Sequence, residues 1–150
     1  GRDCQWHAFG SGCSIVESKF AINTFYNMGY EHGFGEDLDY GMQLRRNGCD
    51  VIYSPQCTML HLKAPMGGFR VEHQHAWLTE SVKPKPMPTM LLHYIQNLND
   101  RQFLSYKLKI YIGRITGNKT FRFFKMYREI KQAWANSLKW ARILDKENPK

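Results

Sequence analysis

Three carboxylates stand close together in the segment GFGEDLDYGMQLRRNG, residues 33–48: Glu36, Asp37 and Asp39. Carboxylates this close repel one another, so the cluster is tolerable only where positive charge faces it or where one member holds a proton. A carboxylate in such a setting can act as a general base. The cluster is therefore the first candidate for chemistry in this chain.

The residues that follow predict a helix from about Glu36 to Asn47. Leu38 and Met42, joined at times by Tyr40 and Leu44, have the spacing of one apolar helix face. Gly48 is placed to end the helix, after two arginines that suit the negative end of the helix dipole. The acids thus open a helix, where backbone N–H groups supply positive partial charge.

The rest of the first 82 residues predicts short strands and one more helix. Ile15 and Val16 mark a short strand, and the apolar spacing after them predicts a helix that ends at Gly29. The segment CDVIYSP reads as a strand stopped by Pro55, and QCTMLHL as a second strand-like run before the loop KAPMGGFR.

Prolines divide the chain. The segment SVKPKPMP predicts an extended linker at residues 83–88, since proline removes backbone donors and disfavours helix before it. We therefore expect one region at residues 1–82 and a basic helical region at residues 89–150, with Asp100 as a helix cap.

The last helix is predicted at about residues 120–144 as a basic amphipathic helix. Its apolar stripe consists of Phe123, Tyr127, Ile130, Trp134, Leu138 and Ala141. Residues 1–100 hold 8 Lys/Arg against 10 Asp/Glu, a net of −2, whereas residues 101–150 hold 13 against 3, a net of +10. The division predicts a chemical part and a basic part that docks on an anionic membrane surface.

The overall composition fits a globular domain: 43% of the 150 residues are apolar and 14% aromatic, enough for a core. No apolar run has the length of a membrane span. The four cysteines lack metal-site or disulfide-framework spacing, which favours free thiols in a reducing compartment. The first residues carry no initiator Met or signal pattern, as expected for a piece of a longer protein.

The segment GFGEDLDYGMQLRRNGCDVIYSPQCTMLHL resembles the C-terminal half of a GT-A fold glycosyltransferase, most closely the bacterial family-2 enzymes. The shared order is a glycine, an acidic pair followed by x-Asp, an arginine-bearing helix, a glycine, an apolar strand, a proline and a histidine. The match covers about residues 10–70. It implies an α/β fold, namely the acceptor-side half of a Rossmann-like GT-A domain, followed by C-terminal helices.

The resemblance implies that Asp37 is the base of an inverting sugar transfer from a nucleotide-sugar to an acceptor hydroxyl. Glu36 and Asp39 would tune its basicity. The alternative is that the acids merely complement the dipole of a solvated helix. The family usually has arginine where this sequence has Gln43, which can still bond Asp39 at this helical spacing but adds no charge.

Further residues receive roles from the same resemblance. His61 would help to hold a divalent metal, Mn²⁺ or Mg²⁺, on the donor diphosphate, although a strand-end histidine is as often a packing residue. The loop KAPMGGFR would be a lid: Lys63 and Arg70 would meet phosphates, and Gly67 and Gly68 would allow movement. An ordinary surface loop is the alternative.

The weaker candidates are aromatic and histidine residues. Trp6 and His7 are either packing residues or a platform for a sugar ring. His73 and His75 form an H-x-H pair without an evident third metal ligand.

One family feature has no counterpart. These enzymes bind metal and nucleotide with an Asp-x-Asp that closes an apolar strand in their N-terminal half. The only Asp-x-Asp here, Asp37 to Asp39, opens a helix instead. We therefore expect the nucleotide-binding half to be missing from these 150 residues, which alone should not catalyse transfer.

Two functions follow as hypotheses. The first is an enzyme that takes a nucleotide-sugar donor and a carbohydrate or lipid-linked acceptor in polysaccharide or glycolipid assembly, peripheral on the cytoplasmic face of the cell membrane. The second is a non-catalytic basic module that holds nucleic acid or anionic membrane. Nucleic acid is the less expected partner, because phosphate-binding modules seldom need a carboxylate trio.

Overall fold

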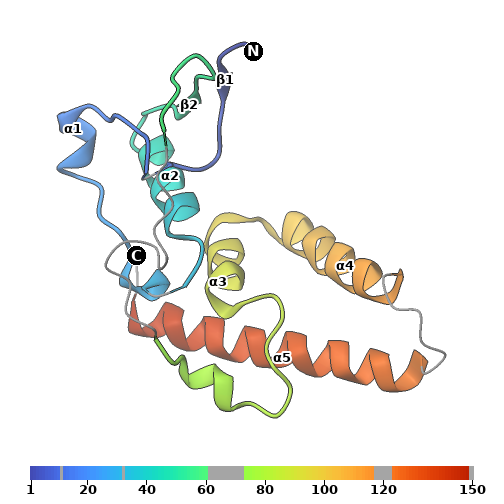
Figure 1. Cartoon of the computed structure of the whole chain (residues 1–150). Helices are drawn as coiled ribbons and strands as arrows, with labels where there is room; N and C mark the ends of the chain where they lie inside the picture. The colour runs from blue at the N-terminus through green and yellow to red at the C-terminus, as the bar shows by residue number, and fades with distance from the viewer. Residues whose placement is uncertain (11, 32, 61–72, 117–122, 149–150) are drawn as a thin grey trace. The chain divides into compact units, whose positions relative to one another are not determined.

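The computed structural model describes residues 1–10, 12–31, 33–60, 73–116 and 123–148 (Figure 1). The chain forms two compact units. The first unit consists of Gly1–Asn27 and Glu36–Gln74, and the second of Met28–Gly35 and His75–Lys150.

The described residues of the first unit form two short strands and two helices. Strand β1 (Cys4–Gln5) pairs antiparallel with β2 (Ile52–Tyr53), with Cys4 opposite Tyr53. Helix α1 (Ser18–Ala21) is a single turn, and α2 (Glu36–Arg46) has eleven residues. The predicted strand near Pro55 is thus present, and its partner is an N-terminal segment that the sequence pattern did not mark.

Helix α1 is much shorter than predicted. The prediction of a helix up to Gly29 was wrong, and Ile15 and Val16 are not in a strand. The Asn23 side chain donates to the Lys19 carbonyl at 3.2 Å and the Thr24 hydroxyl to the Phe20 carbonyl at 2.8 Å. Side chains of this type offer the backbone an alternative to the helical ladder, which explains the early end.

Helix α2 confirms the predicted element and its end, since Gly48 has φ +83° and follows the last turn. Its most buried residues include Tyr40, Gly41 and Leu44, whereas Leu38 and Met42 are only half-buried. Gly41 lies against the backbone of residues 7–9: a Cβ there would stand 2.9 Å from the His7 carbonyl oxygen and 3.0 Å from the Phe9 nitrogen. The N-terminal segment therefore packs closely on this helix.

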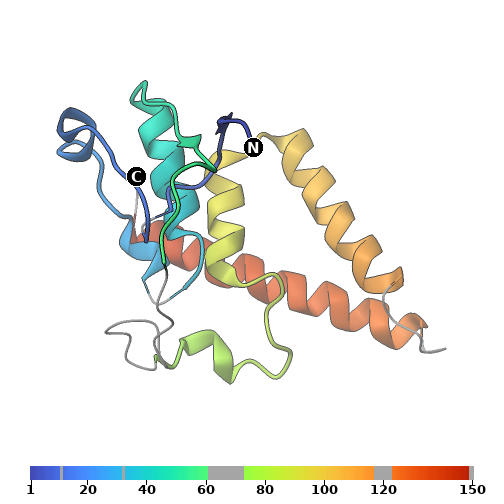
Figure 2. The same ribbon diagram turned by 45° about the horizontal axis from the view of Figure 1, so that its top comes forward.

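The second unit is helical. It contains 3₁₀ turns η1 (Met28–Tyr30) and η2 (Ala76–Thr79) and helices α3 (Pro88–Asn97), α4 (Asp100–Thr116) and α5 (Phe123–Glu147). Helices α3 and α4 both pack on α5 (Figure 2). The buried cluster consists of Tyr30, Leu91, Leu92, Trp134 and Ala141.

The start of α4 shows a reciprocal cap. The Gln102 backbone N–H donates to Asn99 Oδ1 at 2.9 Å, and the Asn99 N–H donates to Gln102 Oε1 at 3.0 Å. This is the capping-box arrangement, with Asn99 in the cap position. The predicted cap, Asp100, is the first residue of the helix instead.

The proline-rich segment predicted as a linker at residues 83–88 packs along α5. The Asn136 side chain donates to the Val82 carbonyl at 2.7 Å, and the Ser137 hydroxyl to the Pro86 carbonyl at 2.6 Å. The Lys85 backbone N–H donates to the Ala133 carbonyl at 3.1 Å. These three bonds join the segment to α5, and the compact units divide between residues 74 and 75 and not at these prolines.

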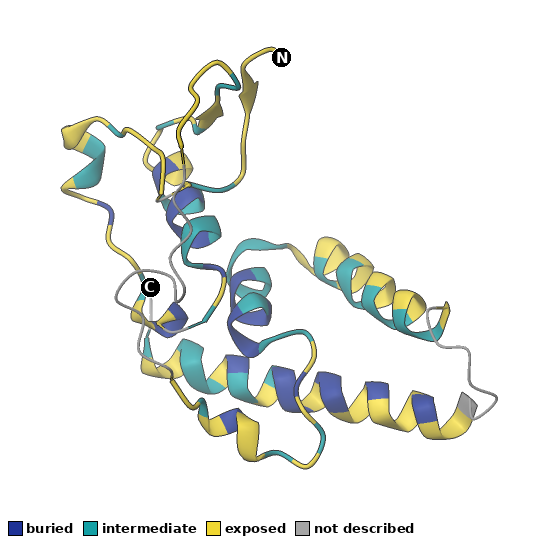
Figure 3. Ribbon diagram, in the orientation of Figure 1, coloured by how far each residue is buried: buried dark blue, intermediate teal, exposed yellow. Residues whose placement is uncertain are grey.

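Helix α5 has the predicted two faces, but its apolar stripe has a different use. Ile130, Trp134 and Ala141 are buried inside the second unit, while the lysines and arginines of the other face are exposed (Figure 3). Protein contacts thus occupy these three residues, whereas Tyr127 of the same stripe is 44% exposed, and membrane docking of this helix stays a prediction. None of the described helices is long and apolar enough to cross a bilayer.

The fold class agrees with the prediction at the level of mixed helices and strands. The described part of the chain is mostly helical, and its sheet has two antiparallel strands. A parallel Rossmann-like sheet is not seen in these described residues. The assignment to half of a GT-A domain therefore remains a proposal.

Candidate active site

The three acids lie together in the first turn of α2, as predicted, but their surroundings differ. Asp39 is only 1% exposed and accepts a hydrogen bond from Gln43 Nε2 at 2.8 Å. The same amide donates to the Phe25 carbonyl at 3.1 Å. The predicted bond between Gln43 and Asp39 is therefore confirmed, and it ties a buried carboxylate to the loop after α1.

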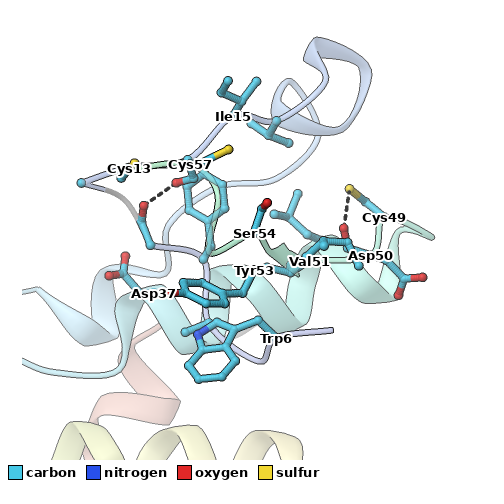
Figure 4. A pocket seen from close by; sticks show the side chains of 18 of the residues that line it. Trp6, Cys13, Ile15, Asp37, Cys49, Asp50, Val51, Tyr53, Ser54 and Cys57 are labelled. Carbon is cyan, nitrogen blue, oxygen red and sulfur yellow. Dashed lines mark hydrogen bonds between the residues drawn. The ribbon is translucent and has the colours of Figure 1, made fainter. Parts of the chain in front are cut away.

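Asp37 faces a cavity of about 730 Å³ that lies entirely within the first unit (Figure 4). Its Oδ1 is shielded from solvent, and its backbone carbonyl accepts the Phe9 N–H at 2.9 Å. Glu36 and Asp39 are not among the residues that line this cavity. Of the three acids, Asp37 alone is therefore placed to meet a molecule bound there.

Two exposed aromatic rings line the same cavity. Trp6 is 44% exposed and Tyr53 50% exposed, and their ring centroids lie 5.5 Å apart. The strand pairing explains this neighbourhood, because the Trp6 N–H donates to the Val51 carbonyl at 2.8 Å directly beyond the β1 and β2 pair. Large rings held side by side and open to solvent offer an apolar surface for a flat ligand face.

Side-chain bonds hold the strands that carry these rings. Gln5 Nε2 donates to Asp50 Oδ1 at 2.8 Å, and the Ser54 hydroxyl donates to Asp3 Oδ1 at 2.7 Å. Both bonds join the N-terminal segment to the region around β2. They fix the register of a very short sheet, which its two residue pairs alone would leave weak.

Tyr26 is a further polar group beside the acids. Its ring stacks on Tyr40 with centroids 4.5 Å apart. Burial raises the pKa of Tyr26 above its ordinary value of 10.0, and the negative charge of Asp37 raises this pKa further. The phenol therefore keeps its proton at neutral pH and can donate a hydrogen bond near the carboxylates.

The remaining predicted site residues lie outside the described residues. These are His61, Lys63, Gly67, Gly68 and Arg70, all within residues 61–72. Within the described ranges, no three His, Cys, Asp or Glu side chains are grouped as metal ligands. His75, one of the weaker metal candidates, stacks on Trp77 at 4.0 Å between ring centroids, which is a packing role.

Comparison of the chain with protein-family models, with curated proteins and with solved structures found no match. The resemblance to glycosyltransferases thus rests on the order of residues in the sequence.

Two functional candidates were missed by the sequence reasoning. Tyr53 was assigned only to a strand, and Tyr26 only to an apolar helix face. Tyr53 could have been singled out only by knowing that β1 pairs with β2. Tyr26 could have been found only by knowing that the chain turns back toward α2 after α1.

Proposed function

We propose that the chain is the acceptor-side part of an inverting glycosyltransferase in which Asp37 is the general base. The observation that supports the proposal is that Asp37 lines one cavity together with the exposed rings of Trp6 and Tyr53. Sugar rings carry apolar C–H faces that pack on aromatic rings, and their hydroxyls need a carboxylate or another polar group. The cavity offers both.

In the proposed reaction the acceptor hydroxyl attacks the anomeric carbon of a nucleotide-sugar. The new bond forms between the hydroxyl oxygen and that carbon, the bond from the carbon to the diphosphate oxygen breaks, and the hydroxyl proton passes to Asp37. The nucleoside diphosphate leaves with the electron pair of the broken bond. Tyr26 keeps its proton at neutral pH and is therefore available beside the acids as a hydrogen-bond donor.

The roles of the other two acids follow from their surroundings. Asp39 is buried and bonded to Gln43, so it shapes the start of α2 and the loop before it. Glu36 adds negative charge beside Tyr26 and Asp37. Neither lines the cavity, and neither takes the proton in this proposal.

The donor side belongs to the proposal as an expectation from the resemblance. A divalent metal would neutralise the leaving diphosphate there. The described residues do not supply a set of ligands for it, and His61 and the lid residues lie outside them. The proposed reaction therefore assigns no step to the metal. Asp37 acts only on the acceptor, by taking its hydroxyl proton.

Replacing each acid in the protein that joins this chain to a nucleotide-binding half tests the proposal. Asp37→Asn keeps the shape and removes the base, so turnover should fall by about 10² to 10⁴ while donor affinity stays nearly unchanged. Asp39→Asn should instead lower the free energy of unfolding by about 1 to 2 kcal/mol, because a charged acceptor of a buried bond is lost. Glu36→Gln should have the smallest effect on turnover and on stability.

Asp50→Asn is the matched control, because Asp50 lines the same cavity and accepts a bond from Gln5. Single-turnover transfer and donor binding would be measured for each variant. An active Asp37→Asn enzyme, or equal losses for Asp37→Asn and Asp50→Asn, would contradict the assignment of the base.

The second candidate, a non-catalytic basic module, is favoured by the net charge of +10 on residues 101–150. It does not account for the carboxylate that faces an aromatic cavity. Tight, salt-sensitive RNA binding that is unaffected by Asp37→Asn, in a protein that transfers no sugar, would favour this reading.

A further inference from the structure

Helix α4 carries an apolar stripe on its exposed face. Leu104, Leu108 and Ile112 are 55%, 52% and 58% exposed and follow one another at intervals of four residues. At 3.6 residues per turn this spacing places them in a row along the helix. The row extends over much of the length of α4, whose outward residues are coloured as exposed in Figure 3.

The opposite face of α4 is also apolar and is already used. Phe103, Tyr106 and Ile110 pack against the buried cluster of the second unit. Burial raises the pKa of Tyr106 to about 12, as expected for a phenol that is withdrawn from water. A helix that is apolar on both faces is normally covered on both, so the exposed stripe calls for a second contact.

The charges around the stripe are mostly positive. By helical periodicity Arg101 lies within the stripe, and Lys107 and Lys109 lie on its two sides. Asp100 is the one acid of α4. Lys107 Nζ lies 5.7 Å from the centroid of the Trp134 ring, so this side chain covers apolar surface of the second unit.

We propose that this stripe, defined as Leu104, Leu108 and Ile112 with Arg101 and Lys109, is a docking surface for an anionic lipid bilayer. Leucine and isoleucine side chains enter the boundary between headgroups and acyl chains, and cations beside them meet the lipid phosphates. The contact belongs to α4 and not to α5, whose apolar stripe is largely buried in the second unit. The proposal does not depend on the glycosyltransferase assignment.

Charge and residue type together favour lipid over other occupants. Nucleic acid would gain from the cations, but single strands bind on aromatic platforms, and the stripe offers aliphatic side chains. A second copy of this chain would bring the same cations against themselves, because a two-fold contact places a patch on its own copy. An anionic bilayer is complementary both to the apolar row and to the positive charge.

Vesicle flotation of the 150-residue chain tests the proposal. Vesicles of phosphatidylcholine mixed with phosphatidylglycerol should carry the chain, and vesicles of phosphatidylcholine alone should carry it far less. Replacing Leu104, Leu108 and Ile112 together by serine should weaken the partition by about tenfold or more, because the buried apolar area is lost. The double variant Arg101→Gln, Lys109→Gln should weaken the partition onto anionic vesicles by several-fold at low salt.

Two matched controls belong to the second unit. Leu78 is an exposed leucine in η2, and Lys85 has an exposed side chain, so Leu78→Ser and Lys85→Gln should float like the wild type. Leu108→Trp gives an independent readout without loss of apolar surface. Its fluorescence should shift to shorter wavelength with the anionic vesicles, whereas that of Leu78→Trp should not.

Several outcomes would overturn the proposal. One is equal flotation of the serine variant and the wild type, with an unshifted Leu108→Trp emission. If light scattering showed a dimer for the wild type and a monomer for the serine variant, the stripe would be a contact between copies of the chain. RNA binding that the serine variant loses would make it a nucleic-acid surface.

Discussion

Asp37 and Asp39 are two residues apart, yet their environments assign them different tasks. Asp39 is buried and held by Gln43, so its charge is committed to the local structure. Asp37 lines the cavity beside the two exposed rings. The crowding is tolerable because one carboxylate is bound inside the protein and the other stands at the helix N-terminus, where N–H dipoles face it.

Trp6 should determine how tightly the acceptor binds. In the proposed glycosyltransferase, Trp6→Ala should raise the KM for the acceptor by about tenfold and change kcat less, since a stacking surface acts in the ground state as well. Trp6→Phe should keep most of the affinity. Phe25→Ala, an exposed aromatic in the first unit that does not line the cavity, is the control. A fall in kcat at constant KM for Trp6→Ala would argue against a platform.

Local pattern predicted the carboxylate cluster and the bond from Gln43 to Asp39, because residues four apart on a helix are neighbours. The rings at Trp6 and Tyr53 come from segments 47 positions apart, and only the strand pairing joins them. Sequence periodicity does not carry that information in a sheet of two residue pairs.

Among the elements, α2 depends on a glycine that its helical pattern does not explain. Helix propensity alone predicts that Gly41→Ala stabilises the protein by about 1 kcal/mol. The Cβ would meet backbone atoms of His7 and Phe9 at 2.9 and 3.0 Å, so we expect a net loss of about 1 to 3 kcal/mol instead. Gly113→Ala is the matched control, a helical glycine with open space around it, and should stabilise.

Urea unfolding of Gly41→Ala and Gly113→Ala shows whether each substitution raises or lowers the free energy of unfolding. The same Gly41→Ala change should disturb the cavity, because residues 6–9 carry Trp6 and Phe9 into its wall. A stabilised Gly41→Ala protein with unchanged acceptor binding would show that the N-terminal segment does not pack on α2 in this way.

Glu80 ties the segment after η2 to α5. It accepts bonds from Lys139 Nζ at 2.8 Å and Trp140 Nε1 at 2.9 Å, and the bond from Lys139 is the main cause that lowers the pKa of Glu80 below its ordinary 4.5. A lowered folded-state pKa gives stability that is present above pH 4.5 and is lost as the pH falls through the lowered value.

We therefore expect Glu80→Gln to lower the thermal midpoint at neutral pH, with the difference from wild type closing as the pH falls below about 4.5. Glu17→Gln is the control, because its pair with Lys19 is open to water and should contribute little. Melting curves of the three proteins across acidic pH test this. A difference that persists unchanged at low pH would mean that the bonds do not depend on the carboxylate charge.

Long, strongly patterned elements were predictable, and short ones were not. Helices α2 and α5 follow from apolar periodicity and their end residues. The predicted length of α1 was wrong because the side chains of Asn23 and Thr24 donate to backbone carbonyls of its last turn. The prolines at residues 83–88 were predicted to separate domains, yet buried side chains of α5 donate to the carbonyls of Val82 and Pro86. Such partners lie some fifty residues away and leave no local signal.

At the scale of the whole molecule, the cavity and most of the positive charge belong to different compact units. The cavity with Asp37 lies in the first unit, and the basic helices lie in the second. The main segment of the second unit begins at His75 and not at the prolines, and the predicted roles of the two parts stay predictions. A membrane contact through α4 would hold the chain at a surface without using any residue of the cavity.

These 150 residues alone should neither bind a nucleotide-sugar with a metal nor transfer sugar. If Asp37 to Asp39 were the metal and nucleotide motif of a glycosyltransferase, the chain would bind a nucleotide-sugar with Mn²⁺. Asp39 is instead buried against Gln43 and does not line the cavity, so we expect no metal-dependent donor binding in calorimetry and no transfer. Joined to a nucleotide-binding half that carries Asp-x-Asp after an apolar strand, the chain should transfer sugar, and Asp37→Asn should slow transfer by about 10² to 10⁴ while donor binding persists. Donor binding by the chain alone that Asp37→Asn removes would reverse the assignment, because it would make this carboxylate a metal ligand and leave the base to another residue.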